Sequence, residues 1–240
     1  MNTIKVEDKG NIRMIAHRGV SGLELENTCP AFVAAGVKSY YGIETDVHVT
    51  VDGKIIVFHD DNLKRLTGID KVVEECTFDE LRAIRMTDKD GVTKRNDLFL
   101  PTLEEYISIC RKYEKEAVLE LKNPMAEEKV WEIAATIESM GWLERTTFIS
   151  FAGENLVNLR KKYPKATAQF LTCKVDEEEF RFMVDNKLDA DLCGTCVTKE
   201  LVDKLHAAGI VVNCWTLDTL EHAQLAKAYG VDFITSNILE

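Results

Sequence analysis

Three acidic residues stand inside stretches of sequence that are otherwise apolar. Glu44 and Asp46 are two positions apart in the run Ile43–Val49, and Glu120 lies in a later run of the same kind. Residues two apart on a strand point to the same face, so the first two carboxylates should lie side by side. Like charges this close repel each other unless a positive charge lies between them. One hard divalent cation, Mg2+ or Ca2+, held by all three carboxylates would remove that conflict and leave positions for water or phosphate.

His17 and His59 are two of the five histidines in the chain, and each follows or ends an apolar run. Imidazoles titrate near neutral pH, so a pair of them can supply the base and the acid that cleavage of a phosphodiester requires. A lone histidine is more often a packing residue, but two beside three carboxylates favour catalysis. We therefore predict catalytic roles for these two. The remaining histidines, His48, His206 and His222, are predicted to be structural.

Two basic residues and one tryptophan accompany these groups. Arg18 follows His17, and Lys122 follows Glu120 by two positions. A guanidinium offers phosphate oxygens a bidentate fork and an ammonium offers a point charge, so both residues could hold a phosphodiester. The alternative is that they only neutralise the carboxylates through salt bridges. Trp215 is predicted either to form the floor of a glycerol or headgroup pocket, facing a choline cation, or simply to pack in the interior.

The elements that must position these residues alternate between short apolar runs and amphipathic helical patterns. Helix starts are recognisable: Asn27 can cap a helix that runs toward Gly36, and Thr102 with Glu105 forms a capping box. This alternation predicts an α/β protein, a (β/α)8 TIM barrel whose C-terminal mouth gathers the candidate residues. A doubly wound open sheet is the structural alternative. The eight predicted strands are Met14–His17, Ile43–Val49, Ala117–Lys122, Thr147–Phe151, Thr167–Thr172, Ala190–Cys193, Ile210–Trp215 and Asp232–Thr235.

One interval, about residues 60–100, departs from this alternation. Just before it, Asp52-Gly53 separates two alternating apolar runs and predicts a β-hairpin. The interval is polar and contains one short predicted helix, Phe78–Ile84, capped by Thr77. We interpret it as a small insertion after the second strand, placed over the top of the barrel. The whole chain would then form a single barrel domain.

Charge and hydropathy narrow the expected partners. The 240 residues carry a net charge of −11, which argues against nucleic acid and against anionic membrane surfaces. No apolar run approaches the ~20 residues of a membrane helix, and the polar segment Met1–Arg13 has no secretory signal. We therefore expect a cytoplasmic protein without stable membrane insertion, or a secreted or periplasmic one if a leader has been removed. A small-molecule substrate is the expected partner, and a homodimer is left open.

Seven cysteines without framework spacing suit free thiols in a reducing compartment. Cys193 and Cys196 form a C-x-x-C motif between a strand and a helix, which is the setting of a dithiol redox site. The chain offers no second pair for zinc, and eight strands do not suit a thioredoxin fold, so we predict no redox role for this motif. P-loop, dinucleotide and nucleophile-elbow motifs are absent from the sequence, which argues against the common NTPase, dehydrogenase and serine-hydrolase chemistries.

Short motifs along the chain are common singly but specific as a set. In order they are Ile15-Ala16-His17-Arg18-Gly19, Glu26-Asn27-Thr28, Ile43-Glu44-Thr45-Asp46-Val47, Val57-Phe58-His59-Asp60, Leu66-Thr67-Gly68, Pro101-Thr102-Leu103-Glu104, Leu119-Glu120-Leu121-Lys122, Ser150-Phe151 and Trp215-Thr216. This set resembles the glycerophosphodiester phosphodiesterase family, over nearly the whole chain. The resemblance implies a TIM barrel with a small insertion after the second strand and Mg2+ or Ca2+ on the three carboxylates. It also implies that His17 accepts a proton and His59 donates one, and that Arg18 and Lys122 contact the phosphate.

The activity implied by the resemblance is hydrolysis of glycerophosphodiesters, such as glycerophosphocholine or glycerophosphoethanolamine, to an alcohol and glycerol 3-phosphate. We expect Phe151 to contact the substrate together with Trp215. The nucleophile is either the glycerol 2-hydroxyl, favoured by proximity, or metal-bound water. The alternatives are a lysophospholipase D, which would need an apolar groove, and a non-catalytic phosphate-binding barrel. In one departure, Ser236-Asn237 ends the last strand where family members often have Thr-Asp, which puts a contact by that acid in doubt.

Overall fold

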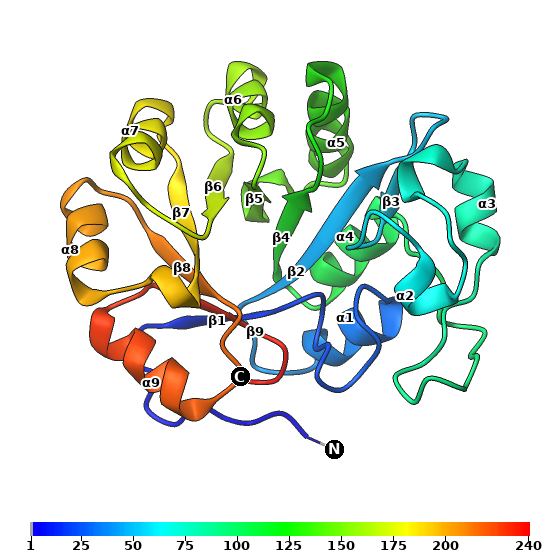
Figure 1. Ribbon diagram of the computed structural model, residues 1–240, viewed down its shortest axis with the longest axis horizontal. Coiled ribbons are helices and arrows are strands. Elements are labelled where there is room, and N and C mark those ends of the chain that lie inside the picture. The colour runs from blue at the N-terminus through cyan, green and yellow to red at the C-terminus, as the bar shows by residue number, and fades with distance from the viewer. Residues whose placement is uncertain (1) are drawn as a thin grey trace.

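A computed structural model describes residues 2–240, and its centre is a closed barrel of parallel strands (Figure 1). Eight strands pair in the order β1-β9-β8-β7-β6-β5-β4-β2, and pairing of β1 with β2 closes the ring. The additional strand β3 is antiparallel to β2, as the Asp52-Gly53 turn predicts. The TIM barrel is therefore confirmed, and the open-sheet alternative is wrong. The strands are β1 (Arg13–Ala16), β2 (Gly42–Val49), β3 (Ile55–Val57), β4 (Glu116–Leu121), β5 (Thr146–Ser150), β6 (Thr167–Thr172), β7 (Asp189–Cys193), β8 (Val212–Trp215) and β9 (Phe233–Ser236).

Helices surround the strands on the outside of the barrel (Figure 1). Several begin at a threonine whose side chain accepts a backbone N–H of the first turn, and the capping box of Thr102 and Glu105 is present. No helix follows β9 within residues 2–240. Instead an N-terminal segment pairs with the chain end, through a bridge between Ile4 and Leu239. The helices around the barrel are α1 (Cys29–Gly36), α4 (Leu103–Lys112), α5 (Glu127–Ser139), α6 (Gly153–Lys162), α7 (Glu177–Asn186), α8 (Lys199–Ala207) and α9 (Leu220–Tyr229).

The N-cap of α1 is Thr28, so the cap predicted at Asn27 is wrong by one residue. The Thr28 hydroxyl accepts the N–H of Ala31 at 3.3 Å. Asn27 has a left-handed backbone with φ of +53°, and its side chain forms other hydrogen bonds. Its side-chain amide donates to Asp46 Oδ2 at 2.7 Å, and its oxygen accepts the Thr45 hydroxyl at 2.7 Å. The residue therefore supports a carboxylate of β2 and does not begin the helix.

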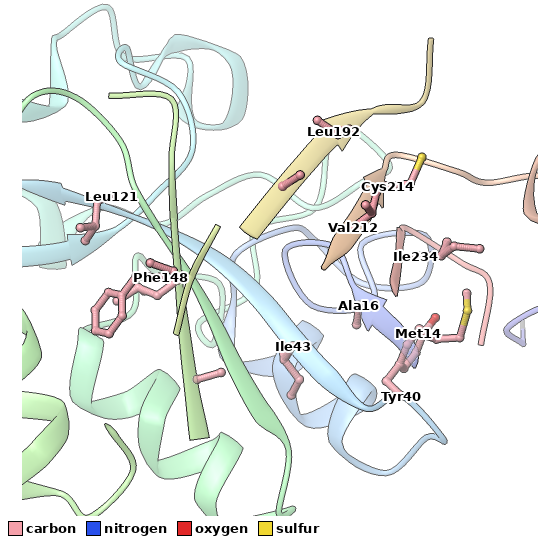
Figure 2. Packing of buried hydrophobic residues seen from close by; sticks show 14 of the residues in the cluster. Met14, Ala16, Tyr40, Ile43, Leu121, Phe148, Leu192, Val212, Cys214 and Ile234 are labelled. Atoms are coloured by element: carbon pink, nitrogen blue, oxygen red, sulfur yellow. The ribbon is translucent and has the colours of Figure 1, made fainter. Parts of the chain in front are cut away.

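The main hydrophobic core lies between the outer face of the strands and the helices. Figure 2 shows part of this core, contributed by strands around the barrel. Buried members of this core come from all eight strands of the barrel, so each strand is packed against the helical layer. Labelled members include Leu121 on β4, Phe148 on β5, Leu192 on β7, Val212 on β8 and Ile234 on β9.

A second, smaller apolar cluster fills the inside of the barrel. It consists of Ile15, Val118, Ile149 and Leu171, with Trp215 and Phe233 packed against it. Because side chains alternate between the two faces of a strand, residues two positions beyond this cluster face the interior at the next level up. Val118 is followed in this way by Glu120, and Ile149 by Phe151. This apolar cluster therefore lies directly below the polar residues of the mouth and supports them.

The segment between β3 and α4 packs around a small core of its own, beside β3 (Figure 1). It contains α2 (Lys64–Thr67), the 3-10 turn η1 (Val73–Glu75) and α3 (Phe78–Ala83), whereas the sequence predicts one helix. The four-residue α2 escapes prediction because its N-cap makes no side-chain hydrogen bond. The capping box of Thr77 precedes α3 as predicted, and α3 ends one residue before the expected Ile84.

Candidate active site

Glu44 and Asp46 on β2 and Glu120 on β4 come together inside the barrel, toward its C-terminal mouth. The two strands are parallel neighbours, and Asp46 lies opposite Glu120 in their ladder. One carboxylate oxygen from each residue lies within 4.8 Å of the other two, and all three residues are buried. The spacing of two along β2 and the register of the ladder together produce this cluster of acids.

Ionisation of these carboxylates is opposed by burial and by their mutual repulsion. Burial, followed by the charge of Asp46, raises the pKa of Glu44 well above its usual range, and the same two causes raise the pKa of Glu120 to about 8. Burial is the largest influence on Asp46 and opposes its ionisation, but the charges of Lys122, His59 and Arg18 together outweigh burial and hold the pKa of Asp46 well below its usual range. The protein's own cations therefore satisfy one acid fully and leave the other two short of positive charge.

Arg18 and Lys122 are the cations nearest the triad, and both form ion pairs with it. Lys122 Nζ lies 2.8 Å from Glu120 and 3.5 Å from Asp46. Arg18 Nε lies 3.8 Å from Asp46, while its Nη1 is committed to Glu26 at 2.7 Å. Arg18 and Lys122 therefore do form salt bridges with the carboxylates, as the alternative expected. Two positive charges do not neutralise the four acids Glu26, Glu44, Asp46 and Glu120.

The donor set nevertheless fits a hard divalent cation. Glu44 Oε2 accepts the backbone N–H of Arg18 at 2.7 Å, and its nearest basic side chain is His17 at 4.0 Å. Among residues 2–240, Asp46 Oδ1 and Glu120 Oε1 are buried and accept no well-directed hydrogen bond. Three carboxylates without thiolate or imidazole partners are the oxygen ligands that Mg2+ and Ca2+ prefer. The cluster could therefore hold such an ion.

His17 follows β1 and is held by a neutral partner. Its Nδ1 lies 2.8 Å from Asn237 Oδ1, and the Asn237 amide donates to Asp218 Oδ2 at 2.6 Å. Since Asp218 fixes the orientation of the Asn237 amide, Nδ1 of His17 carries the proton and Nε2 is free to accept one. Burial, followed by the charge of Arg18, lowers the pKa of His17 to about 4. His17 is thus a neutral imidazole with an open acceptor.

His59 follows β3 and is held by a charged partner. Its Nδ1 lies 2.7 Å from Asp60 Oδ1, and Arg65 Nε lies 2.6 Å from the other Asp60 oxygen. Burial lowers the pKa of His59, although the carboxylates of Asp46 and Asp60 oppose that shift. At Nδ1 an imidazolium at His59 therefore has a carboxylate partner, whereas His17 has the neutral amide oxygen of Asn237. This difference suits His59 to carry a proton and His17 to accept one.

The three other histidines lie outside this arrangement. His48 is buried, lies 3.0 Å from Glu74, and its Nε2 lies 3.4 Å from the backbone oxygen of His59. It therefore supports the turn that carries His59. His206 pairs with Asp232 at 2.9 Å near the N-terminal ends of the strands.

Trp215 and Phe151 form one wall of the mouth. Trp215 ends β8, and Phe151 follows β5. Their rings meet edge to face, with centroids 5.7 Å apart and an interplanar angle of 89°. The Trp215 indole N–H donates to the backbone oxygen of Asp191 at 3.2 Å, which fixes the ring. A cavity of about 50 Å³ lies among these rings and His17, His59, Glu44 and Glu120.

Four residues that position the site carried no assigned role in the sequence. Asn237 stands where family members often have an aspartate, so the sequence left its contact with the site uncertain. It contacts His17, 220 positions away in the chain. Glu26 and Asp60 belong to the motifs quoted above. Arg65 links them, because its guanidinium donates hydrogen bonds of 2.6–2.9 Å to both carboxylates. Pairing of two acids with an arginine in the insertion leaves no periodic signal, so only the folded chain reveals it.

Comparison with known proteins assigns the chain to a family. Residues 17–239 match the model of the glycerophosphoryl diester phosphodiesterase family. The chain belongs to this family. It is also 30% identical over 231 residues to a glycerophosphodiester phosphodiesterase of Bacillus altitudinis, covering 92% of this chain and 93% of that one. The chain is accordingly an enzyme, a phosphoric diester hydrolase.

Structural comparison places this phosphodiesterase among barrels of the same fold. A phosphodiesterase from Oleispira antarctica, in complex with its product sn-glycerol-3-phosphate, has a TM-score of 0.81 and 24% identity, covering 94% of this chain and 93% of that one. A shorter match, 44% identical over 69 residues, joins the chain to a lysophospholipase D of Rattus norvegicus, over 29% of this chain and 22% of that protein. Within residues 2–240, no helix combines the length and apolarity that crossing a bilayer requires.

We predict that His17 is the Nδ1–H tautomer with a pKa of about 4 in the metal-free protein, because burial and Arg18 oppose its positive charge. Nitrogen NMR of labelled protein across a pH titration measures both properties. Asn237→Asp should raise this pKa, since a carboxylate stabilises the imidazolium. The control Asn158→Asp, on α6, should leave it unchanged. An Nε2–H tautomer, or titration at the ordinary 6.5, contradicts the assignment.

Proposed function

We propose that this enzyme hydrolyses glycerophosphodiesters, such as glycerophosphocholine or glycerophosphoethanolamine, to an alcohol and glycerol 3-phosphate, with the help of one divalent cation. The observation that carries the proposal is the grouping of His17 and His59 around one cavity with the buried acids of β2 and β4. A non-catalytic phosphate-binding barrel would not need two histidines whose partners differ in charge.

Glu44, Asp46 and Glu120 would hold the cation, Mg2+ or Ca2+. When bound, the ion would neutralise the crowded carboxylates and act as a Lewis acid toward the phosphate oxygens. Lys122 already spans Asp46 and Glu120, so an added phosphate would lie beside an ammonium that is oriented in advance. Arg18 is oriented likewise by Glu26, which keeps the guanidinium at the mouth. Both side chains would grip the non-bridging oxygens of the phosphodiester.

The two histidines would move the protons. His17, neutral and with Nε2 free, would accept the proton of the attacking hydroxyl, because its pKa disfavours resting protonation. His59, whose Nδ1 proton is directed at Asp60, would hold the second proton at Nε2 and donate it to the leaving alkoxide. Phe151 and Trp215 would line the side of the pocket that receives the substrate, with the indole ring available to a choline cation.

The attacking hydroxyl would be the substrate's own glycerol 2-hydroxyl, which would give a cyclic glycerol phosphate that water then opens. A tethered nucleophile avoids the entropic cost of a second molecule, an advantage of up to ~7–11 kcal/mol in well-oriented systems. Water is the rival nucleophile and would use the same residues.

The metal requirement is tested by release of glycerol 3-phosphate from glycerophosphocholine in a coupled assay. We predict that chelation abolishes activity, that Mg2+ or Ca2+ restores it, and that Glu44→Gln weakens metal binding sharply because it removes one charged ligand. Glu24→Gln is the matched control, since Glu24 pairs with Arg95 outside the triad. Undiminished turnover in a preparation shown to be free of metal would refute this part of the proposal.

The proton carriers are tested by His17→Ala and His59→Ala. Each should lower kcat for glycerophosphocholine by ~10²–10⁴-fold, the usual range for positioned proton transfer. The loss in His59→Ala should shrink on a nitrophenyl glycerophosphodiester, because nitrophenolate leaves without protonation. His206→Ala, in a histidine on α8 that pairs with Asp232 near the N-terminal ends of the strands, is the control. Near-normal kcat for either mutant on the choline substrate would remove that histidine from the mechanism.

The nucleophile is tested with a 2-deoxy analogue of glycerophosphocholine that keeps the phosphodiester and the headgroup. We predict that the analogue binds with similar affinity, measured as competitive inhibition, and is not hydrolysed. Hydrolysis of the analogue at the rate of the natural diester would make water the nucleophile and reduce the 2-hydroxyl to a binding contact.

Lysophospholipids are a second candidate substrate, which an apolar hollow beside the active-site cavity supports. A hollow of about 330 Å³ shares Trp215 with the active-site cavity and is lined by Leu217, Leu225 and Ala226. The partial likeness to a lysophospholipase D points the same way. We predict that glycerophosphocholine has the higher kcat/KM and that Leu225→Asp lowers kcat/KM only for lysophosphatidylcholine. Faster turnover of the lysolipid, lost in that variant, would reverse the ranking.

A further inference from the structure

The C-x-x-C motif does not pair its two thiols with each other. Cys196 lies on the 3-10 turn η3 (Gly194–Cys196), and its Sγ donates to the backbone oxygen of Cys193 at 3.1 Å. Burial, followed by the charge of Cys193, raises the pKa of the Cys196 thiol to about 11. The motif that the sequence singles out therefore leaves Cys193 free to interact with a different partner.

That partner is Cys173, which directly follows the neighbouring strand β6. β6 and β7 are parallel and adjacent in the barrel (Figure 1), and their last ladder pair is Thr172 with Leu192. Cys173 and Cys193 directly follow the two residues of that pair, and their side chains are hydrogen-bonded to each other. Neighbouring strands lie ≈ 4.8 Å apart, which is within the Cα separation of 4.4–6.8 Å that disulfides adopt. Strand register therefore brings the backbones of the two cysteines near the separation that a disulfide requires.

The chemistry of the two thiols differs in a useful way. Burial opposes ionisation of Cys193, but hydrogen bonds from Thr195, whose hydroxyl is 3.2 Å away, and from Cys173 outweigh it and lower the pKa of Cys193. Cys173 is exposed to solvent, whereas Cys110 and Cys214 are buried, with pKa values raised to about 12 by burial. Among the seven cysteines, Cys193 thus combines thiolate character with a neighbouring thiol that reagents can reach.

The pair also borders the active site. Leu171 and Asp191, two residues before each cysteine, line the cavity that holds the catalytic candidates. Cys193 lies directly opposite Trp215 in the ladder of β7 and β8. A covalent link between Cys173 and Cys193 would tie the ends of β6 and β7 together beside the aromatic wall.

We propose that Cys173 and Cys193 form a reversible disulfide at the rim of the active site, made by peroxides and broken by small thiols. The Cys193 thiolate attacks a peroxide oxygen, giving a sulfenic acid and, for hydrogen peroxide, one hydroxide that takes a proton to become water. The Cys173 sulfur then attacks the Cys193 sulfur, forming the S–S bond and releasing the second water. In sum, two thiols and one hydrogen peroxide give one disulfide and two waters, and thiol exchange reverses the reaction.

The disulfide is tested on the intact enzyme by mild hydrogen peroxide, alkylation of the remaining thiols and peptide mass mapping without reduction. We expect one cross-linked species, joining the peptides of Cys173 and Cys193, that disappears with dithiothreitol. Cys196→Ser should keep the cross-link, whereas Cys173→Ser should lose it and carry over-oxidised Cys193. A disulfide between Cys193 and Cys196, or over-oxidation of Cys193 in the wild type with Cys173 still alkylated, overturns the proposal.

The link to the active site rests on the proposed function, because it treats Trp215 as the wall of the headgroup pocket. Peroxide treatment should raise KM for glycerophosphocholine with little change in kcat, and dithiothreitol should restore the original KM. Cys193→Ser should show no such reversible change. Complete cross-linking with an unaltered KM would overturn the link. Mass mapping needs no turnover, so failure of the disulfide is distinguishable from failure of the proposed activity.

Discussion

The constraint on which the rest of this structure depends is the crowding of three carboxylates in the interior of a protein barrel. Glu44, Asp46 and Glu120 are buried within a few ångströms of one another, and within residues 2–240 the lysine and arginine side chains that pair with them are Arg18 and Lys122. Arg18 is shared with Glu26. Removing ionised groups from water costs several kcal/mol each unless they are paired. A binding site for a divalent cation gives this arrangement a physical reason, and the barrel supplies the rigid frame that holds the acids together.

A second theme is that the two histidines differ through their partners. Asn237, from the end of the last strand, offers His17 a neutral oxygen, while Asp60 offers His59 a charge. Asp60 is in turn held by Arg65 from α2, inside the segment inserted after β3. The insertion therefore contributes to the site, because Arg65 orients the carboxylate that lies beside His59.

Much of this architecture could be predicted from the sequence, because it follows from the pattern of residues within short segments. Buried strands, the Asp52-Gly53 turn and the E-x-D spacing follow from alternation and turn preferences over a few residues. The contacts that refine the site could not be predicted, since they join distant positions without periodicity. Asn237 contacts His17, and Cys173 interacts with Cys193, because the strands close in one register. The sequence also predicts the wrong cap for α1. Asn27 is a good local candidate, but its side chain forms a long-range hydrogen bond to Asp46, and Thr28 caps the helix instead.

The most direct test of the account is a crystal of the enzyme soaked with Mn2+ and measured for anomalous scattering. Mn2+ takes the same carboxylate and water ligands as Mg2+ and Ca2+ and can be located without ambiguity. The account predicts one strong peak among the oxygens of Glu44, Asp46 and Glu120, absent from a crystal of Glu44→Gln. A fully active enzyme with no peak inside the triad, the acids still paired only with Arg18 and Lys122, would contradict it.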